Sequence, residues 1–193
     1  MLRPSILILI FLSFPVRACL ADIEIKKEYY PGGTLKCETP YKDGEKHGVC
    51  KYYYDDGKLF SKTSYKNNAL WGTRKCYYKN GQLKIEESYE DNKRCGTAKI
   101  YYENGCLQWE IPYKNGLQCG VIKRYYQSGK LAAEQEHEKG QANGKWRSYY
   151  ENGELSSERY FKESQPHGEW KFYNKDGKLT DTRVYENGKE IND

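Results

Sequence analysis

The sequence has little of what a thick hydrophobic core needs. Only 37% of its 193 residues are hydrophobic, and a single Met is present. Such a low apolar content with 31% charged residues is typical of disordered chains, but disordered chains are also poor in aromatic residues. Here 15% of the residues are aromatic, and the chain contains 20 Tyr. The composition therefore predicts a thin fold rather than disorder.

The sequence also lacks the motifs of common enzymes and metal sites. It contains no nucleophile elbow, phosphate-binding loop, His-Glu-x-x-His motif or dinucleotide-binding fingerprint. It has no Cys-x-x-Cys, which argues against a zinc site. We therefore expect no enzymatic activity, no catalytic residue, no metal and no cofactor.

The first 21 residues predict a secretory signal peptide. Arg3 precedes an apolar run at 5–14 that is too short to span a bilayer as a helix, and small residues surround Ala21. Cleavage after Ala21 would release a soluble chain into the periplasm or the medium. The sequence around Cys19 also resembles a bacterial lipobox, so a form that is lipid-anchored at Cys19 is the alternative. Removal of residues 1–21 lowers the net charge from +5 to +3, because two Arg and no acidic residue are lost.

Residues 22–193 predict one domain of seven repeats, each 24 residues long. We number the positions of the repeat from 0, where Gly stands in every repeat but the first. Position 9 is Gly and position 11 is Leu in all seven repeats, and positions 5 and 6 are a Tyr pair in the first six. The 20 Tyr are concentrated at positions 5, 6 and 17, so the Tyr excess belongs to the repeat. The repeats begin near residues 24, 48, 72, 96, 120, 144 and 168.

Each repeat contains the signals of two β-strands joined by tight turns. Asn-Gly or Asp-Gly at positions 8 and 9, as in Asn80-Gly81, predicts a two-residue hairpin turn in which both residues have positive φ. A second such turn recurs at positions 19 and 20, as in Asn115-Gly116. The sequence therefore predicts an all-β fold, an elongated single-layer antiparallel meander or solenoid of about fourteen strands.

The predicted turn at positions 8 and 9 sets the strand register. It places position 3 opposite position 14, where Lys or Arg faces Glu in five of the seven repeats, as in Lys99 and Glu110. Such cross-strand pairs contribute about 0.2–1 kcal/mol each and support this register. Side-chain alternation places positions 2, 4, 6, 11, 13, 15 and 17 on one face, with Trp146, Trp170 and the Leu column. Positions 3, 5, 12 and 14 share the other face, with the charge pairs and the first Tyr column.

Six cysteines follow the predicted signal peptide, and export would place them in an oxidising compartment. The turn at positions 19 and 20 predicts that Cys37 lies directly opposite Cys50, within the Cα distance that a disulfide needs. We therefore expect a Cys37–Cys50 disulfide, and the alternative is a pair of small buried thiols. The pairing of the other four cysteines stays open. They are Cys76, Cys95, Cys106 and Cys119.

The best copies of the repeat share the pattern Gly-x-Trp-Lys/Arg-x-Tyr. They begin at Gly144 and Gly168, and the copy at Gly144 continues as Tyr-Glu-Asn-Gly-Glu-Leu155. This unit resembles the MORN repeat variant of bacterial proteins, and the likeness covers the chain after residue 21. The resemblance implies an elongated sheet of hairpins that acts as a protein-binding or membrane-proximal scaffold. Many bacterial relatives are labelled antitoxins of toxin–antitoxin systems, which suggests neutralisation of a toxin.

The expected function is that of an exported, non-enzymatic scaffold that binds a protein partner through a Tyr-rich face, because Tyr is favoured at interfaces. The alternative is a module that binds lipid headgroups or glycans at the envelope surface. Nucleic acid is not expected as a partner, because the Glu column offsets the charge of the facing Lys column. The oligomeric state stays open. The candidate binding residues are Tyr53, Tyr77, Tyr101, Tyr125, Tyr149, Trp146 and Trp170.

Overall fold

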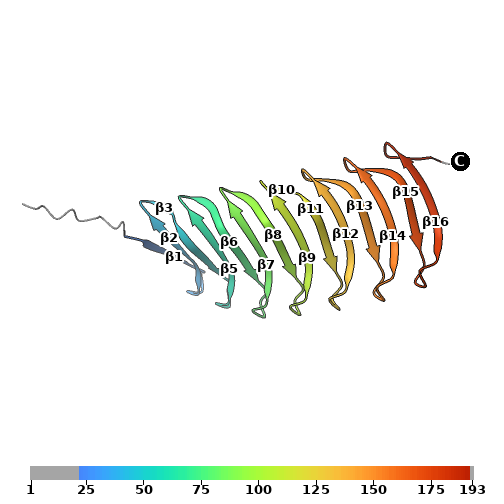
Figure 1. Cartoon of the computed structure of the whole chain (residues 1–193). Helices are drawn as coiled ribbons and strands as arrows, with labels where there is room; N and C mark the ends of the chain where they lie inside the picture. Colours follow the sequence, from blue (N-terminus) through green and yellow to red (C-terminus); the bar gives the residue numbers. More distant parts are fainter. Residues whose placement is uncertain (1–21, 192–193) are drawn as a thin grey trace, which may run out of the picture.

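A computed structural model describes residues 22–191, which form one open antiparallel sheet (Figure 1). The predicted signal peptide, with Cys19, lies outside the described residues. In chain order the strands are β1 (Glu24–Tyr29), β2 (Leu35–Lys42), β3 (Glu45–Lys46), β4 (Gly48–Tyr53), β5 (Leu59–Lys66), β6 (Ala69–Tyr77), β7 (Leu83–Glu90), β8 (Lys93–Tyr101), β9 (Leu107–Lys114), β10 (Leu117–Gln118), β11 (Gly120–Tyr125), β12 (Leu131–Glu138), β13 (Gln141–Tyr149), β14 (Leu155–Lys162), β15 (Gln165–Tyr173), β16 (Leu179–Glu186) and β17 (Lys189–Ile191).

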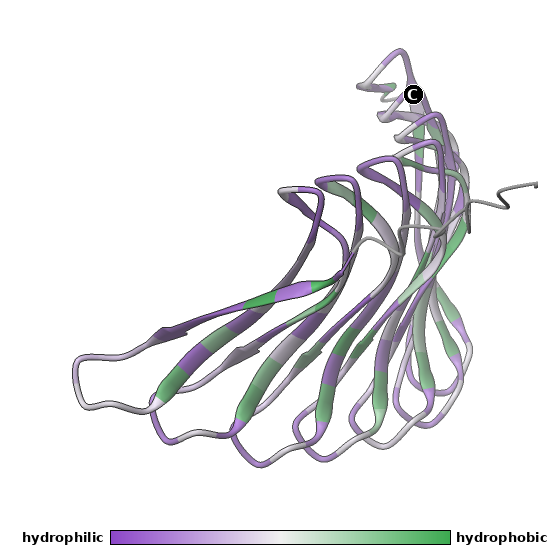
Figure 2. Cartoon of the chain, turned by 90° about the vertical axis from the view of Figure 1, so that its left-hand side faces the viewer, coloured by the Kyte–Doolittle hydropathy of each residue, from purple (hydrophilic) through white to green (hydrophobic). Residues whose placement is uncertain are grey.

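The strands pair with their neighbours in the sequence, so the sheet is the predicted single-layer meander (Figure 1). β3 and β4 both pair with β2, and β10 and β11 both pair with β9, so each of these two pairs is one interrupted strand. The strands are strongly bent, and apolar and polar residues alternate along them (Figure 2). Residues 22–191 contain no helix, and therefore none long enough to cross a membrane.

The turns at positions 19 and 20 are the predicted two-residue hairpin turns. In the first repeat Asp43 and Gly44 have φ values of 53° and 80°, and the strands close on the pair Lys42–Glu45. Both residues keep positive φ even where Gly is absent, as at Glu163 and Ser164 (50° and 65°). This backbone matches the right-handed twist of the strands, which explains why it persists through all seven repeats.

The turns at positions 8 and 9 differ from the prediction, because only the Gly at position 9 has positive φ. In the first repeat the Gly33 N–H donates to the Tyr30 carbonyl and the Tyr30 N–H donates to the Thr34 carbonyl, both at 2.8 Å. These bonds close a three-residue loop with Gly in the left-handed region. The preceding Asn or Asp is favoured for its side chain. The Asn80 Oδ1, for example, accepts the Gln82 N–H at 2.9 Å.

A bulge at position 12 restores the predicted register beyond this longer loop. Tyr29 lies opposite Leu35, but Glu28 lies opposite Cys37, so Lys36 has no partner in the ladder. Position 3 therefore faces position 14 as predicted. The confirmed ion-pair positions are Lys27–Glu38, Lys75–Glu86, Lys99–Glu110, Lys123–Glu134 and Arg147–Glu158. The bulge also turns the Leu column toward the face of the position-5 Tyr, so the predicted face of the Leu column was wrong.

A second bulge, at the Gly of position 0, changes the register between repeats by two residues. Tyr65 lies opposite Leu70, but two residues earlier Thr63 lies opposite Arg74. The Gly residues at position 0 all have φ between 66° and 117°, a range that other residues rarely adopt. The bulge explains why Gly recurs at this position.

This bulge makes the predicted opposition of Cys37 and Cys50 wrong. Cys37 lies opposite Tyr52, and Cys50 pairs on its other side with Thr63. Both thiols are buried, at 4% and 0% exposure, and are free. The other four cysteines of residues 22–191 are free as well, and among them Cys119 is exposed. The described chain therefore contains small buried thiols where a disulfide was predicted.

Candidate functional site

The sheet has two faces of different character. We call the face with positions 2, 4, 13, 15 and 17 the inner face, and the face with positions 3, 5, 11 and 14 the outer face. Nearly all buried side chains, such as Cys50, Glu87 and Ile122, lie on the inner face, and the exceptions are Pro40 and Ala132. In a single layer, side chains are buried where the sheet curves around them, so we infer that the bent strands curve around the inner face.

The structure does not bring the predicted binding residues together on one face. The five Tyr of position 5 lie on the outer face, because they pair with the Leu column, and the hydroxyls of Tyr53, Tyr125 and Tyr149 reach the Glu of position 14. Trp146 and Trp170 lie on the inner face, where each is paired with the Arg of position 15. The predicted binding set therefore divides into two groups that no single flat partner can contact at once.

On the outer face, three of the five predicted Tyr already donate their hydroxyls to carboxylates. Tyr125 donates to Glu110 at 2.9 Å, and Tyr149 donates to Glu134 at 2.9 Å. Burial, together with the hydrogen bond to Glu, raises the pKa of each of these two phenols to about 12. Tyr53 makes the same bond to Glu38 at 3.2 Å.

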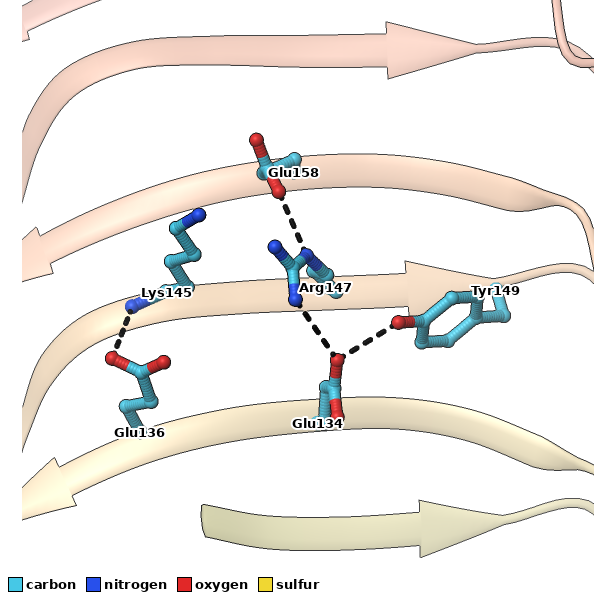
Figure 3. Close-up of polar contacts among 6 residues, drawn as sticks. All are labelled: Glu134, Glu136, Lys145, Arg147, Tyr149 and Glu158. Carbon is cyan, nitrogen blue, oxygen red and sulfur yellow. Dashed lines mark hydrogen bonds and ion pairs between the residues drawn. The ribbon is translucent and has the colours of Figure 1, made fainter. Parts of the chain in front are cut away.

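The charge column of the outer face completes this network (Figure 3). Arg147 lies between two carboxylates, and its Nε donates to Glu158 at 2.7 Å while its Nη1 donates to Glu134 at 3.4 Å. Glu136, beside the position-0 bulge, accepts the backbone N–H of Lys145 at 3.1 Å. The carboxylates and the guanidinium group in this part of the outer face therefore compensate one another's charge.

The second Tyr of each pair, at position 6, links successive repeats. Its hydroxyl donates to the backbone carbonyl at position 5 of the next repeat, at 2.6–2.8 Å. These six bonds run along one edge of the stack and hold adjacent hairpins together. The donors are Tyr30, Tyr54, Tyr78, Tyr102, Tyr126 and Tyr150. Much of the Tyr content therefore has a structural role.

The inner face of the last repeats carries a row of aromatic rings that are tilted against one another. The ring centroids of Trp146 and Phe161 lie 5.4 Å apart, those of Phe161 and Trp170 lie 5.2 Å apart, and those of Trp170 and Tyr185 lie 4.3 Å apart. The Trp170 indole N–H donates to the Tyr160 carbonyl at 3.0 Å, which fixes the ring. Such rings present large, rigid apolar surfaces with a polar edge.

Arginines lie over this row. The guanidinium carbon of Arg159 is 4.5 Å from the centroid of the Trp146 ring and 5.7 Å from that of Trp170. In the middle repeats two arginines of this face have a carboxylate partner. Glu87 forms ion pairs with Arg74 at 3.4 Å and with Arg94 at 3.1 Å. The aromatic and cationic character of the inner face is therefore concentrated toward the C-terminal repeats.

Sequence reasoning missed Phe161, Tyr185 and Arg159 as partners of the two Trp. The signal was present, because positions 15 and 17 alternate onto the same face as position 2. In residues 22–191 no group of three or more His, Cys, Asp or Glu side chains is arranged to hold a metal ion. What the inner face offers is stacking, apolar contact and guanidinium hydrogen bonds.

The chain is similar to one known family of repeats. The family model described as MORN repeat variant matches residues 25–43, 46–67, 72–91, 94–115, 118–139, 142–163 and 166–187. No curated protein matches the sequence significantly. A solved structure titled "Crystal structure of GtfA/B complex bound to UDP and GlcNAc" aligns over 61% of this chain with 19% identity and a TM-score of 0.26. This chain spans 23% of that one, and so weak a likeness carries no argument.

Proposed function

Because this chain belongs to the MORN repeat variant family, we propose that it is a non-enzymatic scaffold that binds a protein partner through the inner face of its last repeats. The row of aromatic rings from Trp146 to Tyr185 is the observation that supports this proposal. No second layer covers the row within the described residues. Trp, Tyr and Arg are the residue types that contribute most at protein interfaces.

The outer face suits this role less well than the Tyr-rich composition suggested. A partner that engaged the hydroxyls of Tyr125 or Tyr149 would have to compete with hydrogen bonds that those groups already make to Glu. Exchanging a satisfied hydrogen bond for another gains little free energy. The inner rings lose no such bonds when a partner covers them, so burial of their apolar surface is a net gain.

The charge pattern favours a protein over an anionic membrane as the partner. Polybasic clusters bind acidic lipids, whereas the outer face alternates Lys or Arg with Glu, as in Arg147 and Glu158. The arginines of the inner face lie over aromatic rings instead of projecting as a cluster. Export and neutralisation of a toxin stay predictions of the sequence.

Co-purification from the native cell with two pairs of substitutions tests the proposal. Trp146→Ala with Trp170→Ala removes inner-face rings, and Tyr101→Ala with Tyr125→Ala removes outer-face rings of the same sheet. We expect one stoichiometric protein partner that the inner pair loses and the outer pair retains, with the far-UV circular dichroism of both variants unchanged. Loss with the outer pair alone, or salt-sensitive binding to liposomes without a protein partner, would contradict the proposal.

A further inference from the structure

A hollow opens on the inner face beside the aromatic row. Trp109 and Arg124 line one side of it, and Trp146 and Arg159 line the other. The hollow exists because position 13 is Trp in one repeat and Ala133 in the next. Ala133 lies opposite Arg124 on one neighbouring strand and opposite Ser148 on the other. The small side chains of Ala133 and Ser148 form the floor of the hollow.

Two guanidinium groups reach this hollow without a carboxylate partner in residues 22–191. Arg159 is half-buried; its Nη2 donates to the Ser148 hydroxyl at 3.1 Å, while its Nε is buried with no acceptor. Arg124 lies with its guanidinium carbon 5.8 Å from the Trp109 ring centroid. Glu134 also lines the hollow, but its carboxylate accepts hydrogen bonds from Arg147 and Tyr149 on the outer face.

Arg159 differs in this respect from the arginine one repeat later. Arg183 occupies the same repeat position and forms an ion pair with Asp181 at 2.8 Å. Burial lowers the pKa of Arg159, which is the direction expected for a charge that lacks a compensating partner. A desolvated charge without a partner is costly, so its presence in a lined hollow points to an anion that arrives from outside.

We propose that this hollow binds a carboxylate side chain, Asp or Glu, from an acidic segment of the protein partner. The inference rests on the proposed function and specifies the partner's chemistry. Guanidinium groups hold carboxylates through paired, charge-assisted hydrogen bonds, and Arg124 and Arg159 both line the hollow without an ion-pair partner among residues 22–191. The flanking indoles of Trp109 and Trp146 provide apolar contact for the methylene stem of the inserted side chain.

Titration of the full chain with a hexaglutamate peptide tests the inference, with hexaglutamine as the uncharged control. Indole N–H resonances in ¹⁵N-correlated NMR spectra report on each Trp separately. We expect hexaglutamate to shift the resonances of Trp109 and Trp146 more than that of Trp71, which lies outside the hollow. Hexaglutamine should produce no such shifts.

Arg159→Gln and Arg183→Gln form a matched pair of variants. A charged hydrogen bond contributes about 1.5–3 kcal/mol, so Arg159→Gln should weaken hexaglutamate binding about tenfold or more. Arg183→Gln should leave it unchanged. Arg159→Gln breaks no ion pair, but it removes the guanidinium from the Trp146 ring and from the Ser148 hydroxyl, so an unchanged far-UV circular dichroism spectrum is needed to show that the variant is folded. Ala133→Leu, which keeps both charges but fills the hollow, should weaken binding as well.

Equal effects of Arg159→Gln and Arg183→Gln, or equal binding of hexaglutamine, would overturn the inference. Tighter binding of inorganic phosphate than of hexaglutamate at the same indoles would overturn it in favour of a phosphate ligand. Retention of the native protein partner by Arg159→Gln, together with its loss from the Trp146/Trp170 variant, would refute the carboxylate pocket alone. If both variants retain the partner, the proposed function itself is refuted.

Discussion

Lys62 breaks the charge pattern of the outer face, and its replacement by Glu should stabilise the protein. Position 14 is Glu in five repeats, but Lys62 lies directly between Lys51 and Lys75 in the ladder. Lys51 and Lys75 form ion pairs with Glu38 and Glu86 respectively, whereas Lys62 has no ion pair within the described residues. Lys62→Glu would turn two like-charge pairs into two opposite-charge pairs.

The size of this gain follows from the register. Each directly opposed charge pair is worth about 0.2–1 kcal/mol, and exposed pairs fall at the low end, so two reversed pairs should raise the free energy of unfolding by roughly 1 kcal/mol. The new carboxylate would also lie where Glu38 and Glu134 accept the hydroxyls of Tyr53 and Tyr149. Tyr77 would then have an acceptor, a contribution of about 1 kcal/mol at most.

Urea unfolding of the wild type, Lys62→Glu and Lys62→Gln measures this effect. Lys62→Gln removes the repulsion without adding a pair, so its gain should be smaller than that of Lys62→Glu. The difference between the two variants should shrink at about 1 M salt, where the Debye length is about 3 Å. If the Lys62→Glu protein is no more stable than the wild type at low salt, the register that places residue 62 opposite Lys51 and Lys75 is refuted.

Three further predictions concern the bulges and the Tyr columns. Tyr126→Phe removes the 2.6 Å bond to the Tyr149 carbonyl and should lower the free energy of unfolding by about 1 kcal/mol in a urea titration. Gly120→Ala should cost about 1–3 kcal/mol in thermal unfolding, because φ is 116° and a Cβ would lie 3.2 Å from the Pro112 side chain; a neutral result would count against the bulge. Between pH 10 and about pH 12 stability should fall, because unfolded phenols lose their protons near 10.0 while the folded pKa of Tyr125 and Tyr149 is about 12. Replacing both by Phe should make that fall shallower in urea titrations across the same pH range.

The strands and the turns at positions 19 and 20 could be predicted from the 24-residue period. That period gives each strand its length, and residues such as Asn115 and Gly116 adopt positive φ at little cost. The pairing of position 3 with position 14 was also predicted correctly, but the turn from which it was predicted differs in the structure. Two deviations from the predicted hairpin, a longer loop and a bulge at Lys36, offset each other.

The bulges could not be placed from side-chain periodicity alone. A bulge changes the backbone count between two strands without changing the spacing of the repeat, so the Gly column is equally regular with or without it. The consequence was largest at Cys37 and Cys50, whose expected opposition depended on an uninterrupted ladder. The Gly at position 0 was the available signal, since Gly inside a strand often marks a bulge.

The candidate site could be predicted only in part. The sequence placed Trp146 and Trp170 on one face and Tyr125 and Tyr149 on the other, as the structure does, but it listed all four as one binding set. Composition does not reveal that a phenol already has a hydrogen-bond partner. The hollow beside Arg159 depends on which side chains are small and which charges are already paired, and both require the register between repeats.

Hydroxyl-radical footprinting of the protein with its co-purified partner tests the central claim most directly. Trp and Tyr both react readily, so one experiment compares the two faces of the sheet. If the inner face of the last repeats binds the partner, oxidation of Trp146 and Trp170 should fall on complex formation while that of Tyr101 and Tyr125 stays constant. Protection of Tyr101 and Tyr125 with unchanged oxidation of the two Trp would contradict the account.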